Sequence, residues 1–156
     1  MPGESVFTPA QRVLLQAVLN RIIPAEGKLP GAGTVGVDET IEGAALASTL
    51  LRRTLLDGLA AIEATAWRTG GNDFVALPAA IQDETLRQVE QARSSFFSQL
   101  VVLTYRGYYL QPRIVQLVGM ETRPPQPDGF TLPTFDVHLL DKVKARGPIY
   151  RPTEGR

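Results

Sequence analysis

The 156-residue chain contains no cysteine. Disulfides, thiolate nucleophiles, iron–sulfur ligation, zinc knuckles and covalent c-type haem attachment are therefore excluded from this chain. Its single histidine, His138, also excludes metal sites that need two histidines. A lone histidine in a tail is most often a surface or interface residue, although its titration near neutral pH leaves a role as a general base open.

The chain also lacks net charge, because 16 Lys and Arg residues balance 16 Asp and Glu residues. A nucleic-acid-binding protein is expected to gather a basic excess on one face, so this class is disfavoured. A neutral chain meets little electrostatic repulsion when it associates with another chain. The charge balance is therefore compatible with an obligate partner.

The sequence predicts neither an export signal nor a membrane span. The opening MPGESVFTPAQR has no basic region followed by an apolar run, and it has no twin-arginine pair. No uninterrupted apolar run approaches the roughly 18 residues that indicate a transmembrane helix. We therefore expect no leader in this chain and no direct membrane insertion.

Helical signals fill the first part of the chain. Thr8 and Gln11 form a capping-box pattern with Pro9 at the first helical position, which predicts a helix that ends at Pro24. Residues 24–36 have the composition of a loop. A second helix is expected from Val37 or Asp38 to about Leu46, with acidic residues at the positive end of its dipole.

Two further helices follow in the sequence pattern. Ser48 is expected to cap a longer helix that Gly70 and Gly71 end. Trp67, the single tryptophan of the chain, is expected to be at least partly buried against a neighbouring helix. Another helix should begin at Pro78.

The stretch from Gln91 to Met120 is the longest apolar-rich part of the chain, and we expect it to hold the central helix of the bundle. Gly107 lowers helix propensity, which predicts close approach by another backbone. Pro112 should open a shorter helix. Two adjacent apolar stripes indicate a helix covered on more than one side; they comprise Phe97, Leu100, Val101, Thr104 and Tyr108, and Phe96, Leu103, Gly107 and Leu110.

The amino-acid composition changes after residue 120. Residues 121–156 are rich in proline but also carry large apolar residues, which disordered tracts usually lack. Residues 136–145 are expected to hold a turn or two of helix. The predicted fold is therefore all-α: a bundle of about five to six helices over residues 1–120, and an extended Pro-rich tail over 121–156 that packs on the bundle or on a partner subunit.

Several motifs have both a functional and a structural interpretation. Residues 31–36 match G-x-G-x-x-G, but no strand precedes them and no βαβ unit follows, so we interpret them as a flexible loop. Asp38, Glu39 and Glu42 could gather a hard cation, yet a solvated helix start explains them better. The pair at 83–84 has the same interpretation. We predict no catalytic, cofactor-binding or metal-binding residues in this chain.

The most informative cluster lies in the predicted central helix and just after it. Consecutive helical positions point in different directions, so its five residues cannot all be core. Tyr and Arg are enriched among interface hot spots. An interface and a mixture of core Tyr with surface Arg remain equally supported for Tyr105, Arg106, Tyr108, Tyr109 and Arg113.

The order and spacing of several segments resemble the gluconate 2-dehydrogenase subunit 3 family. The resemblance covers residues 6 to 120 and is carried by FTPAQRVLLQAVLNRIIPAE, PGAGTVGV, FVALPAAIQDETLRQVE and FFSQLVVLTYRGYYLQP, together with Gly119. Such proteins are similar in being helical, non-catalytic companions of a large FAD-dependent subunit of the glucose–methanol–choline (GMC) oxidoreductase type. That partner oxidises CH–OH groups of sugars, glycosides or alcohols.

The resemblance implies an accessory subunit in a hetero-oligomer, with FAD in the partner and no cofactor in this chain. Many family members carry a twin-arginine leader, whereas no such pair is found in the opening of this chain. The expected location is therefore cytoplasmic, or periplasmic by co-export with a partner that has a leader. The residues expected to bind the partner are the Tyr and Arg cluster between Tyr105 and Arg113, and a set in the tail: Phe130, Phe135, His138, Ile149 and Tyr150.

Two other functions are compatible with the residues alone. One is a stand-alone helical module that binds a small molecule or another protein. The other is an enzyme that uses His138 as a general base, although no nucleophile lies near it in the sequence. We take the accessory subunit as the leading hypothesis.

Overall fold

The computed structural model describes residues 5–120, 134 and 136–147. Contacts divide the chain into two units, Met1–Thr122 and Arg123–Arg156, which are described separately. Four of the predicted partner-binding residues lie outside the described residues: Phe130, Phe135, Ile149 and Tyr150.

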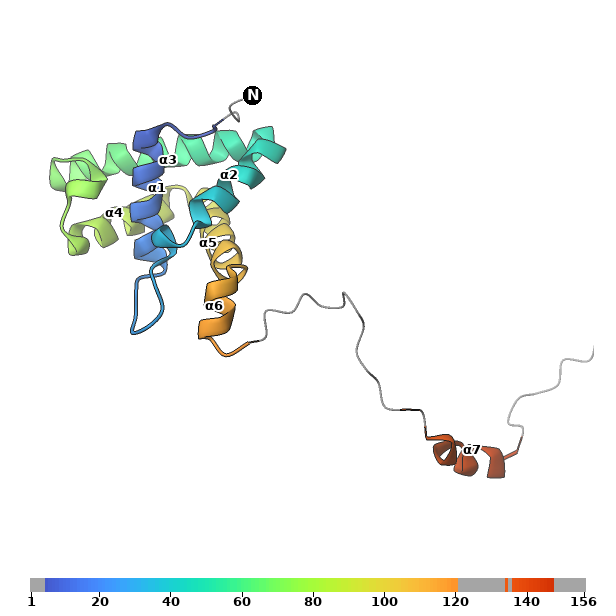
Figure 1. The fold of residues 1–156 in the computed structure, drawn as a ribbon. Coiled ribbons are helices and arrows are strands. Elements are labelled where there is room, and N and C mark those ends of the chain that lie inside the picture. The colour runs from blue at the N-terminus through green and yellow to red at the C-terminus, as the bar shows by residue number, and fades with distance from the viewer. Residues whose placement is uncertain (1–4, 121–133, 135, 148–156) are drawn as a thin grey trace, which may run out of the picture. The chain divides into compact units, whose positions relative to one another are not determined.

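The first unit is all-α, as predicted, and within the described residues it contains no strand (Figure 1). Short 3-10 turns η1 (Ala32–Thr34) and η2 (Phe74–Ala76) lie in two of the connections. The six α-helices are α1 (Pro9–Ile22), α2 (Val37–Ala47), α3 (Thr49–Gly70), α4 (Ala79–Ala92), α5 (Ser94–Tyr109) and α6 (Pro112–Leu117).

The helix ends form where local chemistry predicts them. The Gln11 N–H donates to Thr8 Oγ1 at 3.2 Å, and the Thr8 N–H donates to Gln11 Oε1 at 2.9 Å, which completes the capping box of α1. Ser48 Oγ accepts from the N–H of Leu51 at 3.3 Å and so caps α3. Gly71, with φ of 66°, ends α3 in the left-handed conformation that glycine adopts without steric cost.

Helix α5 is central in its packing, as expected, because it lies against α1, α2, α3, α4 and α6. Only one side of it is buried, however. The inward residues are Phe96, Leu100, Thr104, Gly107 and Tyr108. The prediction of two buried stripes is therefore wrong for Leu110, which is exposed.

Gly107 permits a close approach, but not by a backbone as predicted. A Cβ at Gly107 would lie 2.9 Å from Val37 Cγ1 and 3.5 Å from the Cβ of Thr40, so side chains of α2 fill the space.

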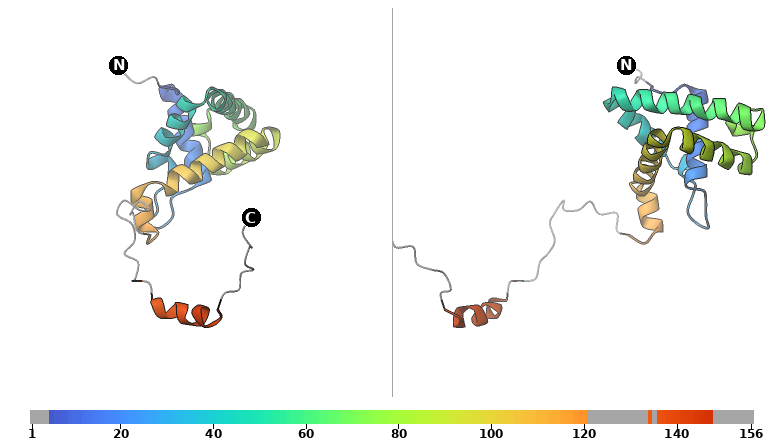
Figure 2. Two further views of the ribbon diagram at one scale, coloured as in Figure 1. Left: turned by 90° about the vertical axis from the view of Figure 1, so that its right-hand side faces the viewer. Right: turned by 180° about the vertical axis from the view of Figure 1, so that it is seen from behind.

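Helix α3 crosses the unit above α4 and α5 in the reverse view (Figure 2). Its inward face includes Leu55, Leu59, Ile62 and Ala66.

Trp67 is the clearest local error of the sequence prediction. Its side chain follows the buried Ala66 by one position and is 56% exposed. One residue is about 100° of helix rotation, which carries Trp67 off the inward face of α3. The largest aromatic residue of the chain is thus at the surface rather than against a neighbouring helix.

Two acidic residues that the sequence predicts to be solvated, Asp38 at the start of α2 and Asp83 in the second turn of α4, form ion pairs. Asp38 is buried and accepts from Arg12 at 3.1 Å and from Gln16 at 3.0 Å. At α4, Asp83 receives both Nε and a terminal nitrogen of Arg21 at 2.7 Å, and this hydrogen bonding holds its pKa below its usual value. Both partners lie on α1, so the acids fix α1 against α2 and α4.

Glu42 fastens the N-terminal arm to α2. Its Oε1 accepts from the N–H of Val6 at 2.8 Å and from the hydroxyl of Ser5 at 2.9 Å, while Oε2 accepts from Arg12. Burial opposes ionisation, but the hydrogen bonds from Arg12, Ser5, Val6 and Phe7 outweigh it and lower the pKa of Glu42 to about 2. Val6 and Phe7 are thereby held in the core.

This anchor predicts a pH-dependent cost for Glu42→Gln. A depressed folded-state pKa stabilises the fold above the unfolded pKa near 4.5 and loses that effect as pH falls towards 2. Urea unfolding at pH 7 should therefore show a loss on the order of 2 kcal/mol, which shrinks between pH 5 and pH 2. Glu39→Gln, at an exposed position of the same helix start, is the control. A cost independent of pH would contradict the ionic role of Glu42.

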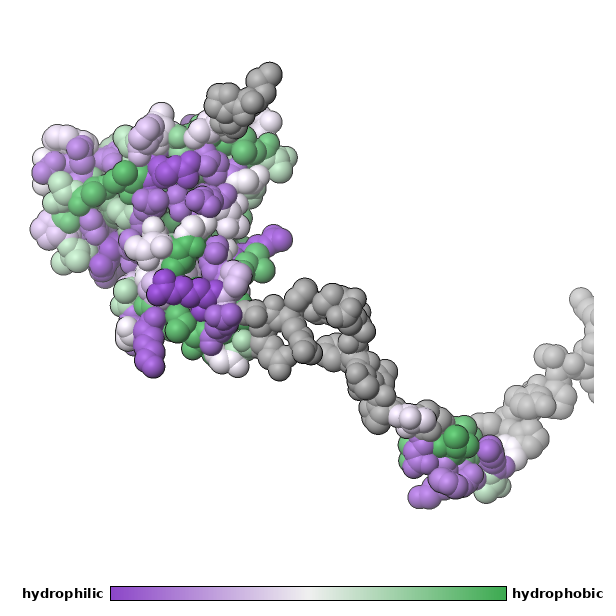
Figure 3. All heavy atoms as spheres, viewed as in Figure 1, coloured by the Kyte–Doolittle hydropathy of each residue, from purple (hydrophilic) through white to green (hydrophobic). Residues whose placement is uncertain are grey.

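The second unit contains the described segment 136–147. Turn η3 (Val137–Leu140) leads into α7 (Asp141–Ala145), as the turn or two of helix predicted there. Asp136 Oδ1 accepts from the N–H of His138 at 3.0 Å and caps the turn. Figure 3 shows apolar and charged residues together on this segment. Its exposed apolar side chains are Val137, Leu139, Leu140 and Val143.

Candidate partner-docking surface

The solvent-facing side of α5 carries an aromatic and cationic strip. We call Val102, Tyr105, Arg106, Tyr109 and Leu110 the α5 outer face; their spacing of three and four residues places them on one side of the helix. All five are exposed, with Val102 at 64% and Tyr109 at 51%. Such side chains in water indicate a surface that another molecule can cover.

The two exposed tyrosines are held in place by ring contacts. The rings of Tyr105 and Tyr109 stack with centroids 6.3 Å apart and planes inclined by 24°. Tyr109 also meets the buried Tyr108 edge-on, with centroids 5.3 Å apart and planes at 89°. A ring fixed from two sides loses little conformational entropy on binding, which favours it as an interface anchor.

Tyr108 itself does not belong to the docking surface predicted from the sequence. Its side chain is 1% exposed, and its hydroxyl donates to the carbonyl of Pro30 at 2.8 Å. Burial, with a smaller contribution from Tyr109, raises its pKa. Here the alternative of a core tyrosine is correct, because Tyr108 points inward and ties α5 to the loop before η1.

The arginines of the cluster are exposed, as an interface requires. Arg106 lies on the α5 outer face, and Arg113 follows on α6. Neither forms an ion pair with an acidic side chain of the described residues. Both are therefore available for carboxylates of a partner.

Two grooves flank the α5 outer face. Towards α3, a groove of about 300 Å³ is lined largely by apolar atoms of Leu51, Val102 and Leu103. Towards α1 and α4, a groove of about 400 Å³ includes Tyr105 and the pair of Arg21 and Asp83. The strip is thus bordered by one apolar and one charged recess.

Sequence reasoning missed part of this surface. The sequence pattern does not single out Val102, and it predicts Leu110 in the core. The exposed residues Leu117, Val118 and Met120 at the end of α6 were also missed. The signal that could have found Val102 is its position three residues before Tyr105, on the side of the helix opposite Leu100 and Thr104.

The glycine-rich loop is packed rather than flexible. Gly33 N–H donates to Asn20 Oδ1 at 2.9 Å, and a Cβ at Gly33 would lie 2.1 Å from the carbonyl oxygen of Gln16. The glycine therefore lets η1 approach the backbone of α1. Its spacing serves helix packing, and a helix rather than a strand precedes it.

The candidate general base, His138, lies at the surface of the second unit. His138 is exposed, with Nδ1 3.2 Å from Asp141 Oδ2. Within the described ranges, no group of three or more His, Asp or Glu side chains is placed to hold a metal ion. Among the same residues, no helix combines the length and apolar character needed to cross a membrane.

Comparison with known protein families gives a match over most of the first unit. The sequence model of a family described as gluconate 2-dehydrogenase subunit 3 matches residues 9–121. The matched range begins at the first residue of α1 and includes all six helices of the first unit. No curated protein and no solved structure is significantly similar to the chain.

Proposed function

Because the chain belongs to the gluconate 2-dehydrogenase subunit 3 family, we propose that it is the non-catalytic small subunit of a larger oxidoreductase. The family match carries the proposal, since it spans the whole helical bundle of the first unit. The family is named as one subunit of a multi-subunit dehydrogenase, which implies a partner chain.

The proposed partner is a large FAD-dependent subunit of the GMC type that oxidises CH–OH groups of sugars, glycosides or alcohols. FAD resides in that partner, and the small subunit stabilises the large subunit or assists the maturation of the large subunit. The packing of Gly33 against Gln16 supports the placement of FAD in the partner, because the glycine-rich motif of this chain packs against its own helix α1.

The α5 outer face is the proposed contact with the large subunit. Tyr105 and Tyr109 supply rigid aromatic area, and Arg106 with Arg113 supply planar donors for bidentate pairing with carboxylates. We propose a second contact through the tail. In the described part of the tail, η3 and α7 bury no residue. Their apolar side chains and His138 are exposed and could lie against a partner.

Co-purification tests this function. The full chain should retain a flavoprotein through size-exclusion chromatography, and a chain ending at Met120 should retain less of it while keeping its helical circular dichroism. Dehydrogenase turnover should be found in the complex and not in the isolated chain. Turnover by the isolated chain would contradict the non-catalytic role.

A further inference from the structure

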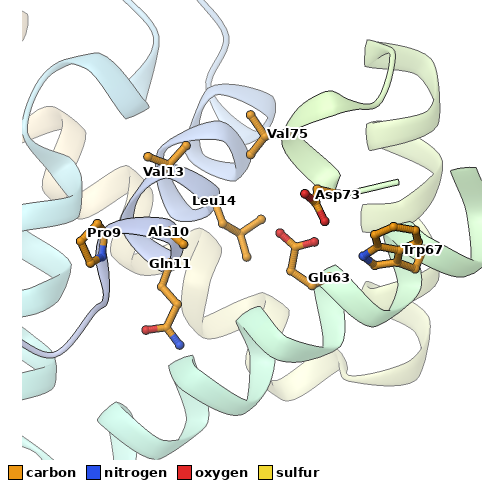
Figure 4. Close-up of a pocket in the computed structure, with 9 residues that line it drawn as sticks. All are labelled: Pro9, Ala10, Gln11, Val13, Leu14, Glu63, Trp67, Asp73 and Val75. Atoms are coloured by element: carbon orange, nitrogen blue, oxygen red, sulfur yellow. The ribbon is translucent and has the colours of Figure 1, made fainter. Parts of the chain in front are cut away.

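A second surface lies on α1, α3 and η2, and it shares no residue with the α5 outer face. There a groove of about 660 Å³ opens between the first turns of α1, the second half of α3 and η2 (Figure 4). That volume falls in the range of ligand-binding clefts, roughly 300–1,000 Å³. The lining residues that carry the argument are Val13, Glu63, Trp67, Asp73 and Val75.

The groove exposes large apolar side chains on both of its sides. Trp67 borders it from α3, Val13 from α1 and Val75 from η2, and all three are exposed. Tryptophan at the surface is among the residues most enriched in interface hot spots. The groove thus offers an anchor that the core of the bundle does not use.

Two carboxylates share the groove with the indole. Glu63 lies one helical turn before Trp67, and Asp73 precedes η2. The N–H of Phe74 donates to Glu63 Oε2 at 3.3 Å, which orients this carboxylate, while the Asp73 side chain caps no N–H of η2. Figure 4 draws both carboxylates on the Trp67 side of the groove.

The charge of the lining is one-sided. Among the described residues that line it, two are acidic and none is Lys, Arg or His. Neither carboxylate pairs with a cationic side chain of the described part of the chain. An occupant that complements this lining carries a positive charge on an otherwise apolar body.

We propose that this groove binds an arginine side chain presented by an apolar segment of a partner protein. A guanidinium group is planar, so it can stack on the Trp67 indole and at the same time donate to Glu63 and Asp73. Apolar neighbours of the arginine then cover Val13 and Val75. The inference adds a site to the proposed function and does not depend on a flavoprotein.

Trp67 makes the site directly observable, because it is the single tryptophan of the chain. The probe is the peptide acetyl-Leu-Arg-Val-Leu-amide, titrated into the full chain while Trp67 emission is followed. The control peptide replaces arginine by citrulline, which keeps the shape and removes the charge. We expect saturable binding of the arginine peptide and affinity at least about fivefold weaker for the citrulline peptide.

Variants separate the groove from general charge effects. Glu63→Gln with Asp73→Asn should weaken the arginine peptide at least about tenfold, whereas Asp57→Asn, which removes an exposed carboxylate of the same helix outside the groove, should leave affinity unchanged. Trp67→Leu should weaken binding as measured by calorimetry, while the melting temperature of the chain stays unchanged.

The peptide measurements can overturn the proposal in several ways. These are equal affinities for the two peptides, full affinity in the Glu63 and Asp73 double variant, and no saturable response at millimolar peptide. A Trp67 emission change that follows protein concentration without peptide would also overturn it, by assigning the groove to a second copy of this chain. Loss of flavoprotein co-purification would leave these peptide results standing, so the two proposals fail separately.

Discussion

Replacing Tyr105 and Tyr109 together by alanine is expected to weaken association with the proposed large subunit by at least about 30-fold. Hot-spot aromatics each contribute on the order of 2 kcal/mol or more, and their effects are not additive. The two rings stack on each other at 6.3 Å, so one substitution also loosens the second. The measurement is the dissociation constant with purified large subunit in biolayer interferometry.

The fold should survive this double substitution. Tyr105 is 46% exposed, and the internal contacts that the substitution removes are the Tyr105–Tyr109 stack and the edge-on packing of Tyr109 against Tyr108, each worth about 1 kcal/mol. Tyr105→Phe with Tyr109→Phe keeps the stacked rings and should retain most of the affinity. Unchanged affinity of the alanine variant, with a normal melting curve, would move the interface away from α5.

Charge reversal gives a second readout of the same surface. Arg106→Glu should weaken association and reduce its dependence on salt, because it removes an exposed cation that would pair with carboxylates of the partner. The substitution breaks no ion pair among the described residues. Arg53→Glu on α3 is the control outside the α5 outer face; Arg53 is exposed as well, and its pair with Asp57 at 3.8 Å is long and solvent-exposed. Equal effects of both reversals would indicate a general charge effect instead of a local contact.

Gly33→Ala and Gly43→Ala are expected to change stability in opposite directions. A Cβ at Gly33 would stand 2.1 Å from the Gln16 carbonyl oxygen and 2.8 Å from its carbon, and both atoms belong to the backbone of α1. The loop must move away from the helix, at a cost of about 3 kcal/mol. Tyr108, which donates to Pro30 beside this loop, should then lose part of its support.

Gly43 is the internal control for the same chemical change. It lies within α2, and a Cβ there would meet nothing within 4 Å. Alanine at an open helical position should stabilise the fold by about 0.5–1 kcal/mol, because it restricts the unfolded chain. Urea midpoints at constant slope measure both effects. A neutral Gly33→Ala would show that the loop is not packed on α1 as described.

Local chemistry accounts for what the sequence predicted well. The capping box of Thr8, the Ser48 cap and the left-handed Gly71 depend on residues within one turn, so their signals are complete in the sequence. The all-α class follows from apolar periodicity in the same way. The predicted turn of helix after residue 136 is also local, and Asp136 caps it.

Long-range contacts account for what was missed. Asp38 has the signature of a solvated helix start, but its partner Arg12 comes from another helix. Trp67 and Ala66 are neighbours in sequence, and the rotation of α3 against α4 decides which one is buried. The lack of a preceding strand argues against a phosphate site at Gly31, Gly33 and Gly36 already in the sequence, whereas the packing of Gly33 against Gln16 of another element is visible only in the structure.

The candidate site was half predictable for the same reason. The Tyr and Arg cluster was identified from its composition, whereas the register of α5 decides that Tyr108 is core and Tyr105 and Tyr109 are surface. Val102 and Leu110 belong to the surface by that register as well. Composition therefore located the segment, and three-dimensional packing selected the side chains.

The absorbance spectrum of a co-purified complex tests the central claim most directly. The tagged full chain is co-expressed with its candidate large subunit, purified through the tag, and eluted after a high-stringency wash. The account predicts a second, larger chain in the eluate and flavin absorbance that scales with that chain, with both reduced by Tyr105→Ala and Tyr109→Ala together. An eluate that contains the small chain alone, without a flavin band, would contradict it.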